Sequence, residues 1–263
     1  MINPNSLSGL TVLITRPSNQ ADSLRQAIES GGAKVLSLPL IEIKALNGAQ
    51  AIQDLKDKVL QLDCYRSLIF ISNNAVSFGG EVINNYWPQF PLGVDVIAVG
   101  PTTAAAASER FACEVIQPIN GMTSEDILRL PQLQDVSEKK IGIVRGQGGR
   151  ELLADTLRER GAIVDYLEAY SRTAVDYTSA DFCNRLREAG VNVLTVSSGE
   201  SLDRLTHLLA GNRKKLQQLN LLVPSERVGR QAGKAGYQQV HNASGADPLS
   251  FVSALGELGI NQK

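Results

Sequence analysis

The chain carries one arrangement of hydrophobic runs and small residues twice, and this repetition limits its fold more than any other feature. A hydrophobic run ends in Leu13-Ile14-Thr15-Arg16, and a later one ends in Gly142-Ile143-Val144-Arg145. A Gly-Ala pair begins at Gly32 after the first run, and another begins at Gly161, at the same distance after the second. The two halves of the chain therefore open in the same way.

A second pair of landmarks repeats further along each half. Ser72 closes a hydrophobic run, and Gly100 closes the next one. In the other half Ser197 closes a run, and Ser225 follows it at the same separation. Two copies of one βα-rich unit thus fill the chain, and we expect a binding site between two similar lobes.

Size, charge and cysteine usage narrow the class of protein. The 263 residues favour two modest domains, and a net charge of −1 gives no general attraction to nucleic acid or acidic membranes. No apolar run approaches the roughly 20 residues that span a bilayer, and residues 1–5 lack the features of a signal peptide. Three widely spaced cysteines suit reduced thiols. We therefore expect a cytoplasmic protein, and nothing in the pattern requires it to be other than a monomer.

Short apolar runs alternate with amphipathic stretches along the whole chain. The runs predict buried strands at residues 10–15, 34–38, 67–71, 94–99, 114–116, 140–145, 191–196, 220–223 and 238–241. Helices are expected to begin near Pro17, Asn73, Pro101, Ser124, Gly149, Glu200, Arg227 and Asp247. Strands separated by helices predict an α/β fold with doubly wound parallel sheets.

Two segments depart from this alternation. Residues 39–43 and 167–172 are mixed in polarity and occupy equivalent places in the two copies. We interpret them as connectors more than core strands, so that the chain crosses between lobes twice, near residues 40 and 170.

Small hydroxyl and amide residues stand at several predicted strand ends. In open parallel sheets ligands bind beyond the carboxyl ends of the strands, where the N-termini of the following helices bind anions. Each such residue taken alone fits a helix N-cap better than a ligand contact, but their equivalent positions favour binding for the set. The candidates are Thr15, Ser72, Asn73, Asn74, Gly100, Thr102, Thr103, Ser197, Ser198 and Ser225.

Arg16 and Arg145 end matching strands, and Gly146 follows the second of them. An arginine there either pairs with a ligand carboxylate through two hydrogen bonds or bridges to a surface acid. The residues alone leave both readings open.

Several familiar motifs are absent. Residues 146–151 follow a strand, but Glu151 stands where a dinucleotide-binding loop has its third glycine. Residues 229–235 are one residue short of a phosphate-binding P-loop and lack its Ser/Thr. His207 and His241 have no cysteine nearby in the sequence, which argues against a metal site or a catalytic triad. We therefore expect no cofactor and no metal.

The strand-end motifs, in order, resemble the uroporphyrinogen-III synthase family over nearly the whole chain. The matching segments are 14–17, 39–42, 70–76, 98–104, 123–125, Arg145-Gly146 and Gly149-Arg150, and the tyrosine of the family after the second crossover corresponds to Tyr170. Two segments depart from the pattern. Residues 223–228 replace a second Gly-Pro-Thr-Thr motif, which leaves Ser225 without the threonine hydroxyl, and residues 197–200 match the usual serine turn only in part.

The resemblance implies two Rossmann-like lobes, residues 1–40 with 172–263 and residues 43–168, joined by a two-stranded linker formed by residues 39–46 and 165–174. It also implies a lyase that cyclises hydroxymethylbilane, a linear tetrapyrrole with eight carboxylates, to uroporphyrinogen III, with inversion of the last ring, loss of water and no cofactor. Tyr170 is then expected to be the catalytic residue, as a hydrogen-bond or proton donor to the departing hydroxyl. The strand-end residues, with Arg16, Arg145 and Gly146, would bind the substrate.

Two other classes of protein remain open from the residues alone. A two-lobe cytosolic receptor for a small polyanion would use the same helix termini and would not need Tyr170. A nucleotide-dependent enzyme is disfavoured by both incomplete glycine motifs.

Overall fold

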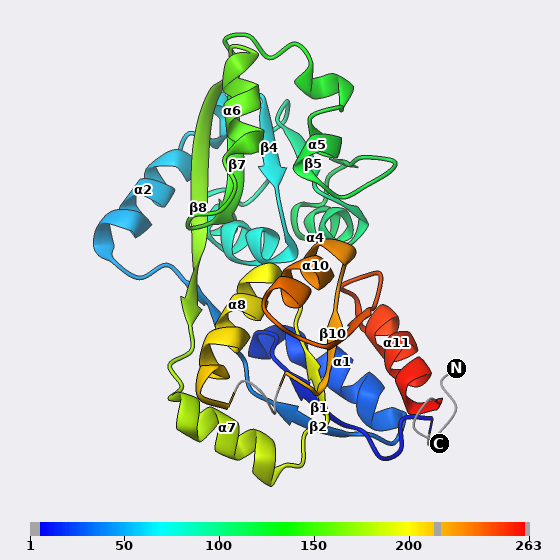
Figure 1. Cartoon of the computed structure of the whole chain (residues 1–263). Coiled ribbons are helices and arrows are strands. Elements are labelled where there is room, and N and C mark those ends of the chain that lie inside the picture. The colour runs from blue at the N-terminus through cyan, green and yellow to red at the C-terminus, as the bar shows by residue number, and fades with distance from the viewer. Residues whose placement is uncertain (1–5, 213–216, 261–263) are drawn as a thin grey trace. The chain divides into compact units, whose positions relative to one another are not determined.

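The computed structural model describes residues 6–212 and 217–260 (Figure 1). Contacts within the chain divide it into two compact units. The first combines residues 1–42 with 173–263, and the second is residues 43–172. None of the helices in the described part of the chain is long and apolar enough to cross a membrane.

The first unit is built on a five-stranded parallel sheet of order β11-β10-β9-β1-β2. Its strands are β1 (Thr11–Ile14), β2 (Lys34–Ser37), β9 (Val193–Thr195), β10 (Asn220–Val223) and β11 (Gln239–Asn242). Its helices are α1 (Ser18–Ser30), α7 (Ser179–Glu188), α8 (Gly199–Leu208), the short η4 (Ala210–Asn212), α10 (Glu226–Lys234) and α11 (Pro248–Ile260).

Side chains of the central strands alternate between the two faces of this sheet. Leu13 packs in a core with residues of α7, α8 and α10, whereas Val12 and Ile14 pack with residues of α1 and α11. Helices therefore cover both faces.

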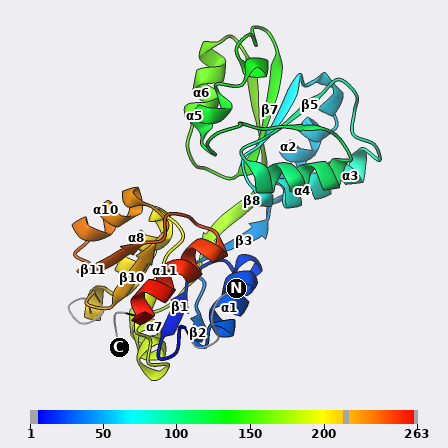
Figure 2. The ribbon, with the colours of Figure 1, turned by 90° about the vertical axis from the view of Figure 1, so that its right-hand side faces the viewer.

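The second unit is built on a six-stranded sheet of order β3-β8-β7-β4-β5-β6. Its strands are β3 (Ile41–Ala45), β4 (Ser67–Phe70), β5 (Asp95–Ala98), β6 (Val115–Ile116), β7 (Lys140–Gly146) and β8 (Ile163–Ala174). Strands β4 to β8 pair in parallel, and the register shifts between Arg145 and Gly146. Figure 2 shows β3 and β8 side by side at the sheet edge.

The helical segments of the second unit also cover both faces of their sheet. They are α2 (Ala49–Val59), η1 (Leu62–Cys64), η2 (Ala75–Gly79), α3 (Gly80–Tyr86), α4 (Pro101–Phe111), α5 (Ser124–Ile127), η3 (Pro131–Leu133) and α6 (Leu152–Glu159). Leu68 and Phe70 pack in a core with α2, α3 and α4, and Ile69 packs in a second core with α5 and α6.

The predicted α/β class with parallel sheets is confirmed, and all nine predicted strands form. The two segments interpreted as connectors form strands over most of their length, because residues 41–45 form β3 and residues 167–172 lie within the long β8. The two units divide within these strands, between residues 42 and 43 and between residues 172 and 173. Leu167, Ala169 and Tyr170 of β8 are buried in the core of the second unit. Helices α2 and α7 had no counterpart among the predicted elements.

Candidate functional site

In the second unit the carboxyl ends of β4, β5 and β7 are followed by residues that the sequence singles out. Ser72 and Asn73 follow β4, and Thr103 lies in the first turn of α4. The hydroxyl of Thr103 donates a hydrogen bond to Oδ1 of Asn73 at 2.9 Å. The parallel register therefore brings together residues from two strand ends.

Tyr170 reaches the same cluster from β8. Its side chain is fully buried, and its hydroxyl lies 3.1 Å from Oγ of Ser72. Ser72 also accepts a hydrogen bond from the backbone N–H of Ala75 at 3.1 Å, which fixes its orientation. The ring of Tyr170 lies against that of Phe78, with 5.6 Å between centroids. Ser72 is half-buried whereas Tyr170 is fully buried, so Ser72 is the more exposed residue of this pair.

Gly146 allows the Tyr170 ring to occupy this position. A Cβ atom at residue 146 would lie 2.4 Å from Cε2 of Tyr170, much closer than an ordinary contact. The sequence singled out Gly146 as a binding residue, and the structure places it directly against Tyr170.

Arg145, the last-but-one residue of β7, is only 2% exposed. Its Nη2 donates to the carbonyl of Gly148, and its Nη1 lies 3.3 Å from the carbonyl of Arg150 and 3.5 Å from Oε1 of Glu151. Its Nε lies 3.3 Å from the carbonyl of Gly146. The guanidinium is therefore directed at the loop that follows its own strand.

The loop at residues 146–150, which we call the glycine loop, turns at two glycines. Gly148 has φ +69° and Gly149 has φ +106°, conformations that side chains with a Cβ rarely adopt. The loop leads into α6 and carries the side chain of Arg150.

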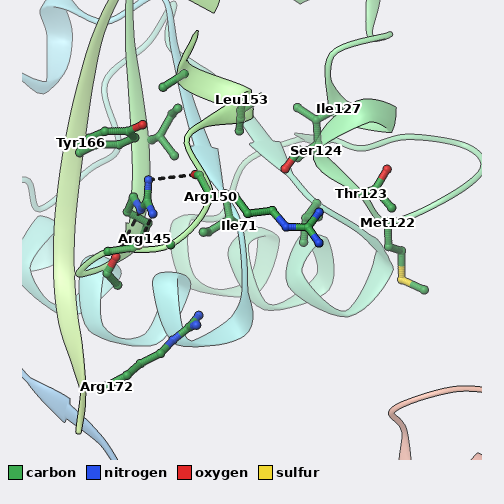
Figure 3. Close-up of a pocket in the computed structure, with 16 residues that line it drawn as sticks. Ile71, Met122, Thr123, Ser124, Ile127, Arg145, Arg150, Leu153, Tyr166 and Arg172 are labelled. Atoms are coloured by element: carbon green, nitrogen blue, oxygen red, sulfur yellow. Dashed lines mark hydrogen bonds between the residues drawn. The ribbon is translucent and has the colours of Figure 1, made fainter. Parts of the chain in front are cut away.

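A pocket of about 390 Å³ lies beside the glycine loop (Figure 3). Its lining combines apolar residues from strand ends and helices with the guanidinium groups of Arg145, Arg150 and Arg172. Its lining residues are Ile71, Val99, Met122, Thr123, Ser124, Ile127, Ile143, Arg145, Gly146, Gly148, Gly149, Arg150, Leu153, Ala154, Tyr166 and Arg172. The lining contains no aspartate or glutamate, so the pocket is cationic and partly apolar.

Tyr166 stacks beneath Arg145, with the guanidinium carbon 4.5 Å from the ring centroid. Its hydroxyl donates to Oε2 of Glu151. Burial, and then this hydrogen bond, raise the pKa of Tyr166 above its usual value. Glu151 thus contacts both Arg145 and Tyr166 at the edge of the pocket.

In the first unit, Thr15 and Arg16 follow β1 and are buried. The Thr15 hydroxyl donates to the carbonyl of Thr195 at 2.7 Å. Nη2 of Arg16 donates to the carbonyl of Ala246, and its guanidinium lies 4.9 Å from the ring centroid of Phe251. Burial lowers the pKa of Arg16, and the charge of Asp247 opposes this.

The remaining predicted residues lie at helix starts. Ser198 caps α8, with Ser201 Oγ accepting from its backbone N–H in return, and Ser225 caps α10. Gly100 precedes α4, Thr102 is exposed in its first turn, and Asn74 directly precedes η2. Ser197 is half-buried just after β9.

Only two of the predicted site residues, Arg145 and Gly146, line the pocket. The pocket is also lined by Thr123, Ser124 and Arg150. These residues belong to segments that match the family pattern, but they were not among the predicted site residues. Arg172 carried no signal of its own. Within the described residues, no three histidine, cysteine, aspartate or glutamate side chains cluster as metal ligands would.

Comparison with known proteins gives a consistent result. The family model for uroporphyrinogen-III synthase HemD matches residues 22–253. The uroporphyrinogen-III synthase of Salmonella typhimurium is 34% identical over 94% of this chain and 100% of its own length, and that of Escherichia coli gives the same three figures.

Solved structures agree on the fold. A mutant uroporphyrinogen III synthase from Thermus thermophilus has a TM-score of 0.64 at 14% identity, covering 97% of this chain and 100% of its own. The Helicobacter pylori enzyme has a TM-score of 0.58 at 14% identity, covering 97% and 99%.

Proposed function

Because this chain belongs to the uroporphyrinogen-III synthase family, we propose that it cyclises hydroxymethylbilane to uroporphyrinogen III, with inversion of the last pyrrole ring and loss of water. The observation that carries this function is the match at 34% identity along the full length of two enzymes of that name. We propose further that it acts in the cytoplasm as a monomer, without a cofactor, and with residues 1–40 plus 172–263 and residues 43–168 as its two lobes.

The pocket beside the glycine loop is suited to part of such a substrate. Its isoleucine, valine and leucine side chains can pack against a pyrrole ring, and its arginines supply positive charge that attracts the acetate and propionate arms. The local positive charge explains how a chain with a net charge of −1 binds a polyanion. Hydroxyls at strand ends add further donors for carboxylates.

We assign the departure of the hydroxyl group to the Tyr170–Ser72 pair. Ser72 gives its proton to the leaving oxygen, and Tyr170, 3.1 Å away, replaces it, so that water departs. The proton that the last ring loses when its aromaticity is restored returns to the pair. The pyrrole supplies the electrons for bond cleavage, and the protein supplies position and a proton.

A receptor would bind its polyanionic ligand in the same pocket but would need neither the Tyr170 nor the Ser72 hydroxyl. The full-length match to named synthases favours the enzyme. No observation of the structure favours the receptor.

Product analysis tests the function. Hydroxymethylbilane, which closes to the type I isomer without an enzyme, is incubated with the protein, and the oxidised uroporphyrins are separated. Predominantly type III product is expected. Type I product alone, formed at the uncatalysed rate by folded protein, would refute the assignment.

A further inference from the structure

We propose that Arg150 is the residue of the pocket that binds a substrate carboxylate, and that Arg145 is a positioning residue that holds the glycine loop for it. This inference rests on the proposed function, since the ligand is a carboxylate arm of the tetrapyrrole. The family resemblance implied that Arg145 binds the substrate. Carboxylate binding falls instead to Arg150, and the positioning of the loop to Arg145.

The donors of Arg145 are directed at its own loop. The carbonyls of Gly146, Gly148 and Arg150, together with Oε1 of Glu151, receive hydrogen bonds from Nε, Nη1 and Nη2. An arginine has five N–H donors, so one remains. A side chain that is 2% exposed, stacked on Tyr166 and bonded in this way has little capacity left for a ligand.

The other copy of the repeat shows a comparable arrangement. Arg16 is buried at the matching strand end, lies over the ring of Phe251 and donates to the carbonyl of Ala246, in the loop before α11. In both copies the strand-end arginine lies over an aromatic ring and bonds a loop that leads into a helix. The shared arrangement indicates a shared structural role.

Arg150 differs from Arg145 in its exposure and in its partners. Arg150 is exposed, and within the described part of the chain no acidic side chain forms an ion pair with its guanidinium. Two acids near the loop have other partners: Glu151 bonds Arg145 and Tyr166, and Oε1 of Glu168, on β8, lies 3.4 Å from the backbone nitrogen of Gly148. Figure 3 shows the Arg150 side chain extended across the pocket towards the segment of Thr123.

The backbone of the glycine loop links the two arginines. Nη1 of Arg145 bonds the carbonyl of Arg150 itself, and Gly148 and Gly149 make the turn that brings residue 150 to the pocket. Arg145 therefore sets where the Arg150 side chain begins. A change at Arg145 should affect substrate binding through Arg150.

Kinetics with the full chain and freshly prepared hydroxymethylbilane test the proposal. Arg150→Gln removes the charge at similar length and should raise KM about tenfold, since a charge-assisted hydrogen bond contributes about 1.5 kcal/mol or more. Its effect on kcat should be much smaller. The matched control is Arg187→Gln, which removes the same charge from exposed Arg187 in α7 of the first unit and should leave KM unchanged.

A second pair of variants separates positioning from binding. Arg145→Lys keeps the charge but lacks the planar set of donors, so it should raise KM in the natural background and add little in the Arg150→Gln background. The proposal would be overturned if Arg150→Gln left KM unchanged. It would also be overturned if Arg145→Lys raised KM by the same factor in the Arg150→Gln background as in the natural background. If the unmodified protein forms no type III product, the function itself fails. If the unmodified protein forms type III product and the Arg150→Gln variant has the same KM, only the inference about Arg150 is refuted.

Discussion

Replacing Gly146 by alanine tests whether the Tyr170 ring depends on the missing side chain at that position. The new Cβ would lie 2.4 Å from Cε2 and 2.8 Å from Cζ of Tyr170. Ordinary carbon contacts are about 3.5 Å or longer, so the ring must move by about 1 Å. The ring is confined, because Tyr170 is fully buried and its ring also lies against that of Phe78.

The size of the effect follows from two changes. Overpacking of a filled core lowers the free energy of unfolding by about 1–3 kcal/mol. Displacement of the ring also weakens the bond between Tyr170 and Ser72, worth a further ~1 kcal/mol. Backbone strain makes no contribution, because Gly146 does not have a positive φ. We expect a total loss of about 2–4 kcal/mol.

Trp87 provides the assay, because it is the single tryptophan of the chain and lies in the second unit. Its fluorescence during urea unfolding reports the stability of that unit. The loss should largely disappear in a Tyr170→Val background, where the ring is gone. Gly148→Ala is the matched control, because a Cβ there meets no atom within 4 Å and only φ +69° opposes it, so its loss should be the same in both backgrounds. An equal loss for Gly146→Ala in both backgrounds would refute the reasoning.

Three further predictions concern single side chains. Tyr170→Phe should lower kcat at least tenfold, measured as the rate of type III product, because Ser72 loses its proton source; unchanged turnover would remove Tyr170 from the mechanism. Burial lowers the pKa of His241 from 6.5, so the unfolded chain binds the proton first and the free energy of unfolding should fall as pH drops through about 6.5. Urea unfolding of His241→Asn should show less of this decline, and an identical pH profile would contradict the assignment. Thr15→Val removes the buried bond to the Thr195 carbonyl and should destabilise the first unit by about 1–3 kcal/mol in thermal unfolding; no change would mean that this bond contributes nothing.

The strand pattern could be predicted because the central strands are short apolar runs whose side chains are buried on both faces. Val12 and Leu13, for example, face different cores, so neither position is polar. The same reasoning failed for β8, because one of its faces and its end are partly exposed and its sequence is mixed in polarity. Burial decides the polarity pattern, and β8 is buried only in part.

The site was predictable to the level of strand ends but not to the level of contacts. The repeat spacing identified Ser72, the family resemblance identified Tyr170, and the fold brings their hydroxyls together. It did not distinguish an arginine whose donors are used by its own loop from one that is open to a ligand, because the difference between Arg145 and Arg150 arises from burial and from the turn at Gly148 and Gly149. These roles remain predictions until the variants are measured.

The discontinuity of the first unit has a consequence for biosynthesis. The backbone N–H of Thr11 bonds Oδ1 of Asn192, 181 positions later, and β1 pairs with β9. At about 5–20 residues per second, the ribosome exposes β1 and β2 for roughly 10 to 40 s before β9 is made. The second unit is contiguous and can fold during that interval, while β1, which can already pair with β2, waits for its other neighbour β9. A circularly permuted chain that begins at residue 173 would synthesise the first unit without interruption. We expect native structure to appear earlier during translation of that permutant than of the natural chain. The difference in time would measure how long the natural order of the chain delays assembly of the first unit.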